Sequence, residues 1–276
     1  MSAPPSARAE LVAAFRARHR PGDPFVLPNP WDAGSARLLA SLGFQALGTT
    51  SAGLAHSRGR PDGRNRLDRA TTLANAGAIA AATRLPVSAD LESCFATEPG
   101  GVAETIRLAA AAGLAGGSIE DATGDPARPI HDRAAAVDRV VEAVEAARAT
   151  GLVLTARAEN YLYGQADLAD TIDRLQRYGA AGADVLYAPA LPDLDAIRTV
   201  CAEVGRPVNV LADGRYRVAE LAEAGAARIS LGSGLSRTAF GAIGRAARQI
   251  LDQGRFDFLS DALPYAVVNE LMGSPT

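Results

Sequence analysis

Two acidic residues close an apolar stretch that runs from Leu85 to Glu92. The stretch opens with a proline at its second position and ends with Asp90 and Glu92, two positions apart. Its apolar run predicts a buried strand, and residues two apart on a strand project to the same side. Two carboxylates on one side repel each other unless a cation lies between them, and Mg²⁺ suits this place because it prefers oxygen ligands. The stretch therefore predicts a metal site. The alternative is a solvated loop with two unrelated acids.

Polar residues also follow other short apolar runs of the chain. They are Asn29, Ser51, Glu120, Asp121, Arg157, Glu159 and Asn209. If these runs are parallel strands of a barrel, all of these residues gather at the carboxyl ends of the strands, where barrel enzymes carry their active sites. Glu120 then joins Asp90 and Glu92 as a metal ligand, and Arg157 can bind a substrate carboxylate in bidentate fashion.

The turn Ser51-Ala52-Gly53 consists of small residues that leave backbone N–H groups accessible. Such donors can hold a carboxylate or the developing oxygen of an enolate. With the metal, they suit a small oxo-acid whose enolate needs stabilisation. Asn209, on a later strand, is a further candidate for substrate binding.

Eight predicted strands, each followed by a helix, must position these residues. The strands are expected at 25–28, 46–50, 85–92, 115–119, 152–156, 183–187, 207–211 and 228–231. Alternating βα units of this number and length predict a (β/α)₈ TIM-type barrel of the α/β class, as one domain over residues 1–276 with a C-terminal helical extension. A doubly wound open sheet is the alternative, but it calls for a glycine-rich turn after the first strand, where Pro28-Asn29-Pro30 stands instead.

The composition excludes several classes of protein. The chain has 276 residues, of which 48% are hydrophobic, and a net charge of −3 with scattered arginines, so we expect no nucleic-acid partner. No apolar run is long enough to span a bilayer, and the N-terminus lacks the apolar core of a signal peptide, so we expect a cytoplasmic protein without membrane contact. Two cysteines, Cys94 and Cys201, provide no disulfide framework.

Five short motifs resemble the isocitrate lyase/phosphoenolpyruvate mutase superfamily. They are Asn29–Arg37, Thr50–Gly53, Ser88–Asp90, Ile119–Asp121 and Ala156–Arg157. The resemblance covers nearly the whole chain. It implies a (β/α)₈ barrel with a Mg²⁺-dependent site, Mn²⁺ being an alternative metal, that makes or breaks C–C or P–C bonds of 2-oxo-acids and related acids.

The resemblance also implies roles for individual residues. Asp90 is the direct metal ligand, and Glu92 and Glu120 act mostly through waters. The substrate contacts it implies are Ser51 and Gly53 at the oxyanion turn, Arg157 at the substrate carboxylate and Asp62 as an acid on the loop after the second strand. Trp31, within the first motif, walls the pocket or packs in the core.

Departures from the superfamily narrow the function. The lyases carry a Lys-Lys/Arg-Cys-Gly-His loop after the fourth strand and the mutases a Lys and an Asn, whereas this loop reads Ala122-Thr-Gly-Asp-Pro-Ala-Arg128. Ala188-Pro189-Ala190 stands where the lyases have Glu and the mutases His. We expect a Mg²⁺-dependent lyase that cleaves a C–C bond of a small 2-oxo or 2-hydroxy acid by decarboxylation or retro-aldol cleavage. The alternatives are a phosphoenolpyruvate/phosphonopyruvate mutase or P–C hydrolase, and a non-catalytic barrel.

Three further features remain open. Cys94 is either a nucleophile or a small buried hydrophobe, and His56 lies on the loop after the second strand, from which it can enter the site. The segment from Phe256 to Val268 is too apolar to be left in water. With the resemblance, it implies a homo-oligomer, a dimer of dimers, in which helix 236–253 or this segment packs on a neighbouring barrel. The alternative is a segment folded back across its own barrel.

Overall fold

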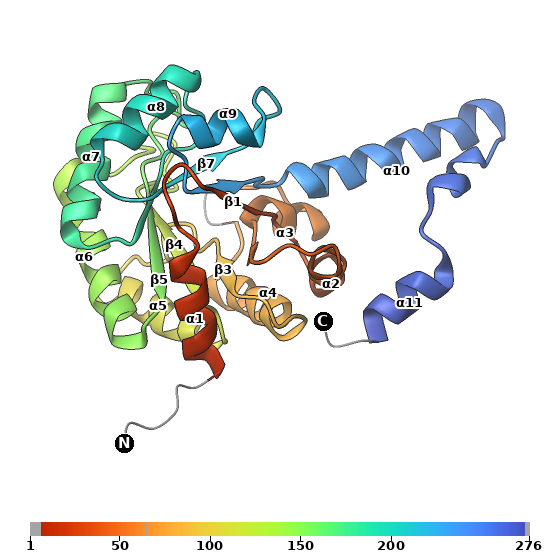
Figure 1. Cartoon of the computed structure of the whole chain (residues 1–276), viewed down its shortest axis with the longest axis horizontal. Coiled ribbons are helices and arrows are strands. Elements are labelled where there is room, and N and C mark those ends of the chain that lie inside the picture. The colour runs from red at the N-terminus through yellow and green to blue at the C-terminus, as the bar shows by residue number, and fades with distance from the viewer. Residues whose placement is uncertain (1–6, 64–65, 274–276) are drawn as a thin grey trace.

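A computed structural model describes residues 7–63 and 66–273 and shows an eight-stranded parallel sheet curled into a barrel (Figure 1). The strands are β1 (Phe25–Leu27), β2 (Leu47–Gly48), β3 (Val87–Ala89), β4 (Gly116–Glu120), β5 (Val153–Arg157), β6 (Val185–Tyr187), β7 (Val208–Leu211) and β8 (Arg228–Ser230). Their order is β1-β8-β7-β6-β5-β4-β3-β2. The predicted (β/α)₈ barrel is confirmed.

Helices alternate with these strands, and most of them cover the outside of the barrel, whereas the first lies at one end and the last two form an extension beyond it. They are α1 (Ala7–Ala17), α2 (Ala33–Ser41), α3 (Ser51–Ser57), α4 (Arg69–Ala81), α5 (Gly101–Ala111), α6 (Arg133–Thr150), α7 (Leu168–Ala181), α8 (Leu194–Glu203), α9 (Val218–Glu223), α10 (Gly234–Gln253) and α11 (Tyr265–Gly273), with a 3₁₀ turn at Asp257–Asp261. Aspartates begin several of them. The side chains of Asp32, Asp68 and Asp132, for example, accept the backbone N–H three residues on, which satisfies donors that a helix leaves open.

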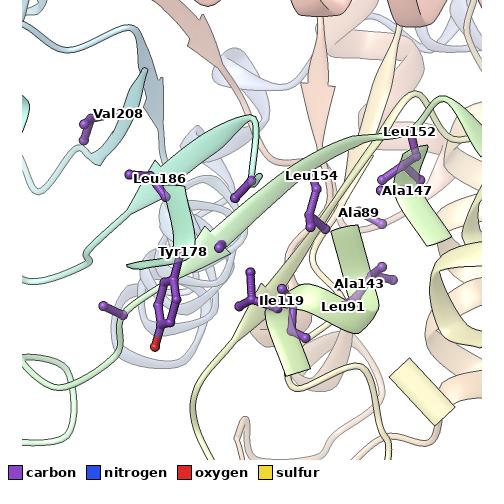
Figure 2. Packing of buried hydrophobic residues seen from close by; sticks show 14 of the residues in the cluster. Ala89, Leu91, Ile119, Ala143, Ala147, Leu152, Leu154, Tyr178, Leu186 and Val208 are labelled. Carbon is purple, nitrogen blue, oxygen red and sulfur yellow. The ribbon is translucent and has the colours of Figure 1, made fainter. Parts of the chain in front are cut away.

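The main core lies between the strands and the helices. Figure 2 shows Ile119, Leu154 and Leu186 from three strands together with Ala143 and Tyr178 from two helices, all of them buried. Because side chains alternate across a strand, the residues between these apolar ones face the barrel interior. Several of those are polar, including Ser118, Thr155, Asn209 and Arg228. The barrel interior is therefore unusually polar for this fold, whose interior is commonly filled by branched apolar residues.

The amino-terminal end of the barrel is plugged by α1 and the segment that follows it. Phe15, with 0% exposure, packs edge-on against His19 and Phe25 at ring-centroid distances of 4.8 and 6.0 Å. A side-chain carbon placed on Gly116 of β4 would lie 2.7 Å from Phe15, so only glycine lets the plug reach this depth. The interior is therefore closed at this floor, and entry is from the carboxyl ends of the strands.

The junction between β1 and β2 is held differently from the others. One backbone bond joins them, from the Gly48 N–H to the Pro28 carbonyl at 3.0 Å. The Asn29 side chain supplies the rest: its amide donates to the Thr49 carbonyl at 3.0 Å, and its oxygen accepts from the Leu231 N–H at 2.8 Å. Asn29 thus joins the first, second and last strands at one point.

Two local predictions are wrong. Ser51–Leu54 is not an open turn: it is the first turn of α3, capped by Thr50. The strand before Asp90 ends at Ala89, and Glu92 has a φ of 47° in the left-handed region, so the same-side rule for residues two apart does not apply to Asp90 and Glu92. In the loop 122–131, Ala122 and Ile130 form an isolated antiparallel bridge.

The C-terminal arm, residues 234–273, departs from the barrel. In Figure 1, α10 projects away from the strands and α11 runs back towards α2. Arg37 on α2 donates to the Met272 carbonyl at 2.8 Å, so the end of the arm touches its own barrel. Along α10, only Ser236 is buried. Among the described helices, none combines the length and apolar content needed to cross a bilayer.

Candidate active site

A cavity of about 200 Å³ opens at the carboxyl ends of the strands and reaches down into the barrel. Pockets for drug-sized ligands are commonly about 300–1,000 Å³, so this one suits a small acid. Its lining includes Ser51, Ala52, Asp62, Asp90, Arg157 and Asn209, which come from β2 and the segments after it, from the residues after β3, and from β5 and β7. The structure thus brings most of the sequence-predicted site residues to one place.

Arg157 is the centre of charge in this cavity. Its Nε donates to Glu159 at 2.8 Å, one Nη lies 3.1 Å from Asp90, and the other lies 3.3 Å from Glu120. The ring of Tyr187 lies beneath the guanidinium, 5.0 Å from its carbon to the ring centroid. Burial opposes the charge, but the three carboxylates more than compensate, and the pKa of Arg157 is raised well above its usual range. All three nitrogens face protein acids, and the role of Arg157 in substrate binding stays a prediction.

The acids around Arg157 outnumber it. Burial raises the pKa of Glu120 well above its ordinary value, and Arg157 only partly offsets this because Glu159, Asp90 and Glu92 add negative charge. Burial likewise raises the pKa of Glu159. Several carboxylates that share one guanidinium form an oxygen-rich site with excess negative charge, which fits a hard divalent cation.

Within residues 7–63 and 66–273, no three His, Cys, Asp or Glu side chains stand in a metal-holding arrangement. The cause lies in the geometry above, since the Arg157 guanidinium stands between Asp90 and Glu120 and neutralises them as a cation would. Glu92 is buried, and its N–H lies 3.4 Å from an Asp90 oxygen. The donor set fits Mg²⁺, and the metal ligands stay a prediction.

Asp62 and the start of α3 form the opposite side of the cavity. Burial, and then the nearby charge of Asp90, raise the pKa of Asp62, and Ser51 donates a hydrogen bond to it. The Ser51 N–H donates to Asp90 at 3.1 Å. The Gly53 N–H was predicted to be accessible to substrate. It is not, because it donates to the capping hydroxyl of Thr50 at 3.2 Å.

The remaining sequence candidates lie outside the cavity lining or have structural partners. Trp31 packs against α3, where a side-chain carbon on Gly53 would lie 3.0 Å from it. Cys94 is fully buried, and burial raises the pKa of its thiol to about 12, so it is a core residue rather than a nucleophile. His56 lies on α3 and is not among the lining residues, although its charge acts on Asp62, which is one of them.

Asp121 belongs to a separate buried network behind β4. It accepts from the Tyr178 hydroxyl at 2.7 Å, the Arg174 guanidinium at 3.1 Å and the Glu159 N–H at 2.8 Å. Strand alternation explains its placement, since Glu120 and Asp121 are neighbours and must face opposite ways. Asp121 thus holds α7 and the segment after β5 against the barrel and does not face the substrate.

Sequence analysis missed the floor of the cavity. Thr155, Tyr187, Arg228 and Ser230 line it, all on strands rather than after them. The signal was present as polar residues two apart within apolar strands, Thr155 with Arg157 and Arg228 with Ser230. On a barrel strand, this pattern indicates side chains that point inward.

Fold and site together define a (β/α)₈-barrel protein with an arginine–carboxylate centre at its strand ends. Residues 15–251 match the family described as phosphoenolpyruvate phosphomutase, and the chain belongs to that family. This places it in the isocitrate lyase/phosphoenolpyruvate mutase superfamily of lyases and mutases, as the resemblance implied.

The chain is similar to proteins that are described with different activities. A crystal structure from Burkholderia cenocepacia J2315, described as a lyase/mutase candidate, is 52% identical with a TM-score of 0.93 and covers 98% of both chains. The 2-methylisocitrate lyase of Shewanella oneidensis is 30% identical over 256 residues, 87% of this chain and 85% of that protein. A phosphonopyruvate hydrolase, solved with oxalate and Mg²⁺, is 24% identical with a TM-score of 0.85 over 95% of both chains, a likeness of fold.

Proposed function

We propose that this protein is a Mg²⁺-dependent lyase that cleaves a C–C bond of a small 2-oxo or 2-hydroxy carboxylic acid through an enolate. The observation that carries the proposal is the cavity at the strand ends, where Arg157 stands among Asp90, Glu120 and Glu159. Such a site combines anion recognition with a place for a hard cation. Both are needed when cleavage leaves an electron pair on an enolate oxygen.

Each residue has a distinct part in the reaction. Asp90 would hold Mg²⁺ directly, and Glu92 and Glu120 mostly through waters. When bound, the metal would supply a Lewis acid for the substrate carbonyl. Arg157 orients the substrate carboxylate. The Tyr187 ring and three acids hold the Arg157 guanidinium in a fixed position.

Asp62 returns the proton that the enolate carbon needs after cleavage. Its side chain lines the cavity, and its raised pKa favours the protonated form that a general acid requires. In a decarboxylation, the C–C electron pair becomes the enolate, CO₂ leaves, and one proton is taken up. In a retro-aldol cleavage, the substrate hydroxyl loses a proton and the enolate gains one.

C–C cleavage is favoured over P–C chemistry by two observations. The curated relative at 30% identity is a C–C lyase. The loop 122–128 lacks the Lys and Asn of the mutases, and decarboxylation needs no acid at the bond that breaks. The superfamily's P–C chemistry remains the second candidate.

Turnover of oxaloacetate, substituted malates and phosphonopyruvate, with Mg²⁺ and with EDTA, tests the proposal. We expect an EDTA-sensitive loss of one of the carboxylic acids, with a rate that falls about 10²-fold in Asp62→Asn, the lower end of general-acid effects. Phosphate release or phosphoryl migration from phosphonopyruvate would favour the second candidate. Absence of turnover together with absence of Mg²⁺ binding in calorimetry would favour a non-catalytic barrel.

We also propose that the protein is a homo-oligomer, a dimer of dimers, assembled through its C-terminal arm. Large apolar side chains of the arm are exposed, among them Phe240, Ile243, Leu251, Leu259 and Tyr265. Exposed apolar surfaces of this extent mark partner surfaces, and closed symmetric oligomers are the common solution. The arm's contact with its own α2 leaves the outer face of α10 for a second chain.

A further inference from the structure

A second arginine lies at the bottom of the cavity. Arg157, Tyr187, Asn209 and Arg228 are successive registered partners on β5, β6, β7 and β8, and all four line the cavity. Because barrel strands tilt by about 36°, such a row descends as it passes from strand to strand. Arg228 accordingly donates to Thr155, the residue two positions before Arg157 on β5, at 3.0 Å. Two positions correspond to roughly 6–7 Å along the strand, so Arg228 lies about one layer below Arg157.

Arg228 is fixed by neutral partners. Its Nε donates to the Asn209 side-chain oxygen at 2.8 Å, one Nη donates to Thr155, and the other lies 3.2 Å from His19 Nε2. These bonds use one N–H of each nitrogen. Since each terminal nitrogen carries two N–H groups, these bonds leave one on each unused, and Arg228 lines the cavity. The guanidinium is thus rigid and oriented before any ligand arrives.

No carboxylate compensates this charge among the described residues. The other buried arginines of the barrel differ: Arg157 pairs with three acids, and Arg174 with Asp121 and Asp170. Arg228 is only 4% exposed, and burial, reinforced by the charge of Arg157, lowers its pKa to about 10. It therefore stays protonated at neutral pH. A buried cation without a counter-ion is costly, and such a residue persists where a ligand or a structural need compensates the cost.

A purely structural role would be to tie β5, β7 and the α1 plug together. Strand pairing already holds the backbones of Thr155 and Asn209 without Arg228. Asn209 donates to the Ser230 hydroxyl at 2.9 Å, and His19 bonds to the Phe15 carbonyl and packs on Phe15 and Phe25. A neutral donor at position 228 could supply the bond to the Asn209 oxygen without burying a charge. The structural role therefore does not account for a cation here.

We propose that Arg228 binds a second acidic group of the substrate, so that the substrate is a short dicarboxylate held by Arg157 at the mouth and Arg228 at the floor. The proposal rests on the proposed function for the reaction, but the binding it describes does not require turnover. It assigns Arg228 as a specificity-determining residue. A monocarboxylate would leave the buried guanidinium uncompensated, which discriminates against it.

Succinate and butyrate test this, because they share a four-carbon chain and differ in the second carboxylate. By calorimetry, we expect the Mg²⁺-loaded protein to bind succinate roughly 10- to 100-fold more tightly than butyrate, the range for hydrogen bonds to a charged group. In Arg228→Met, succinate should fall to the level of butyrate while butyrate changes less than about twofold, since it never used the charge. Arg228→Lys should retain part of the preference.

Thermal unfolding without ligand separates the ligand role from the structural one. The proposal expects Arg228→Met to unfold close to the temperature of the unmodified protein, because removal of an uncompensated buried charge offsets the loss of the bonds to Asn209 and Thr155. Succinate should raise the midpoint of the unmodified protein and of Arg228→Lys but not of Arg228→Met. A large fall in the midpoint of Arg228→Met with equal losses for both probes would overturn the proposal in favour of a structural clamp.

A third probe identifies the acidic group. If 3-phosphonopropionate binds more than tenfold more tightly than succinate in an Arg228-dependent manner, the dicarboxylate assignment is wrong. Equal binding of succinate and butyrate by the unmodified protein would also refute it. None of these results depends on cleavage, so an inactive protein that prefers succinate through Arg228 would remove the proposed lyase reaction and leave this inference standing.

Discussion

The barrel cavity and the C-terminal arm break the usual rule of burial in opposite directions. The cavity buries Arg157, Arg228 and Glu159, whereas the arm leaves Leu251 83% and Tyr265 82% exposed. Charged side chains are rarely fully buried unless paired, and extended apolar patches are rarely left in water. In each region, this free-energy cost is understandable if a molecule outside the chain supplies the missing contacts. On our proposals, an acidic substrate and a divalent cation complete the cavity, and another protein surface covers the arm.

The two regions also differ in what holds them. The cavity stands on registered strands and a closed floor, so its side chains are fixed from several sides. The arm is a 20-residue helix whose single buried side chain is Ser236, followed by a return segment. Helical stability in proteins comes mainly from packing of an apolar face. The side chains of the site are therefore preorganised by the barrel, whereas the arm would be stabilised by the assembly that we propose.

The largest effect is expected from Asp90→Ala, which removes the acid that joins Arg157 and the Ser51 N–H. We expect activity to fall by at least about 10²–10³-fold, as when a preorganised electrostatic group is lost. The fold should persist because Asp90 lies after β3 and not in the core. Turnover measures the activity, calorimetry measures Mg²⁺ binding, and circular dichroism shows whether the fold persists. Unchanged Mg²⁺ binding would remove Asp90 from the metal site.

Asp121→Asn tests how much the buried ion pair between Asp121 and Arg174 contributes to stability. Asp121 is the common acceptor for Tyr178 and Arg174, so its neutralisation leaves the Arg174 guanidinium short of its buried partner. We expect a loss of about 3–5 kcal/mol in the free energy of unfolding by urea. Asp170→Asn, which affects the same arginine from a more exposed position, is the matched control and should cost less. Equal losses for the two would contradict a special role for the buried acid.

Leu251→Glu tests the arm. If α10 packs on a second chain, a charge at this position should dissociate the oligomer, with a cost of about 2 kcal/mol or more for a central interface residue. Light scattering at micromolar concentration should then give a smaller mass. Val218→Glu, at a half-exposed apolar position on α9, is the control and should leave the mass unchanged. A monomeric mass for the unmodified chain would refute the assembly, and an unchanged oligomer after truncation behind Gly254 would exclude the last helix from it.

The smallest effect concerns pH and the floor of the cavity. Burial, and then the charge of Arg228, lower the pKa of His19 from 6.5 to about 3. Below pH 6.5, His19 binds a proton in the unfolded chain but not in the folded chain. The neutral His19 therefore contributes to the free energy of unfolding above pH 6.5, and this contribution is lost as the pH falls towards 3. His19→Gln should be less sensitive to acid by about 1 kcal/mol between pH 6.5 and 5, a value reduced for the partial exposure of the ring. Parallel urea midpoints for both proteins across this range would contradict it.

The barrel was predictable because its signals are repeated and long. Each apolar strand is followed by an amphipathic helix with an aspartate or glycine at one end, and eight such units leave few alternative folds. Asp90, Arg157 and Asn209 were predictable for the same reason, since barrel topology alone brings strand ends together.

The wrong predictions concern short segments whose local structure depends on contacts with the rest of the fold. Ser51–Leu54 consists of residues that suit both a turn and a helix start, and Thr50 capping settles the choice in three dimensions. Glu92 lies beyond the end of its strand, at a left-handed backbone that no sequence rule assigns to glutamate. Arg228 was missed because an arginine within a strand is usually solvent-facing, and only barrel closure places it inside.

Asn29 gives the barrel a fixed order of completion. Pro28 and Pro30 have no N–H to donate, so the first strand cannot form a full ladder with the second, and the Asn29 amide takes its place. Its other partner, Leu231, is 202 residues away. During synthesis, β1 therefore emerges first but finds its second neighbour only when nearly the whole barrel has been translated. Until then β1 has an unpaired edge, and the nascent chain carries an open sheet whose closure waits for its last strand.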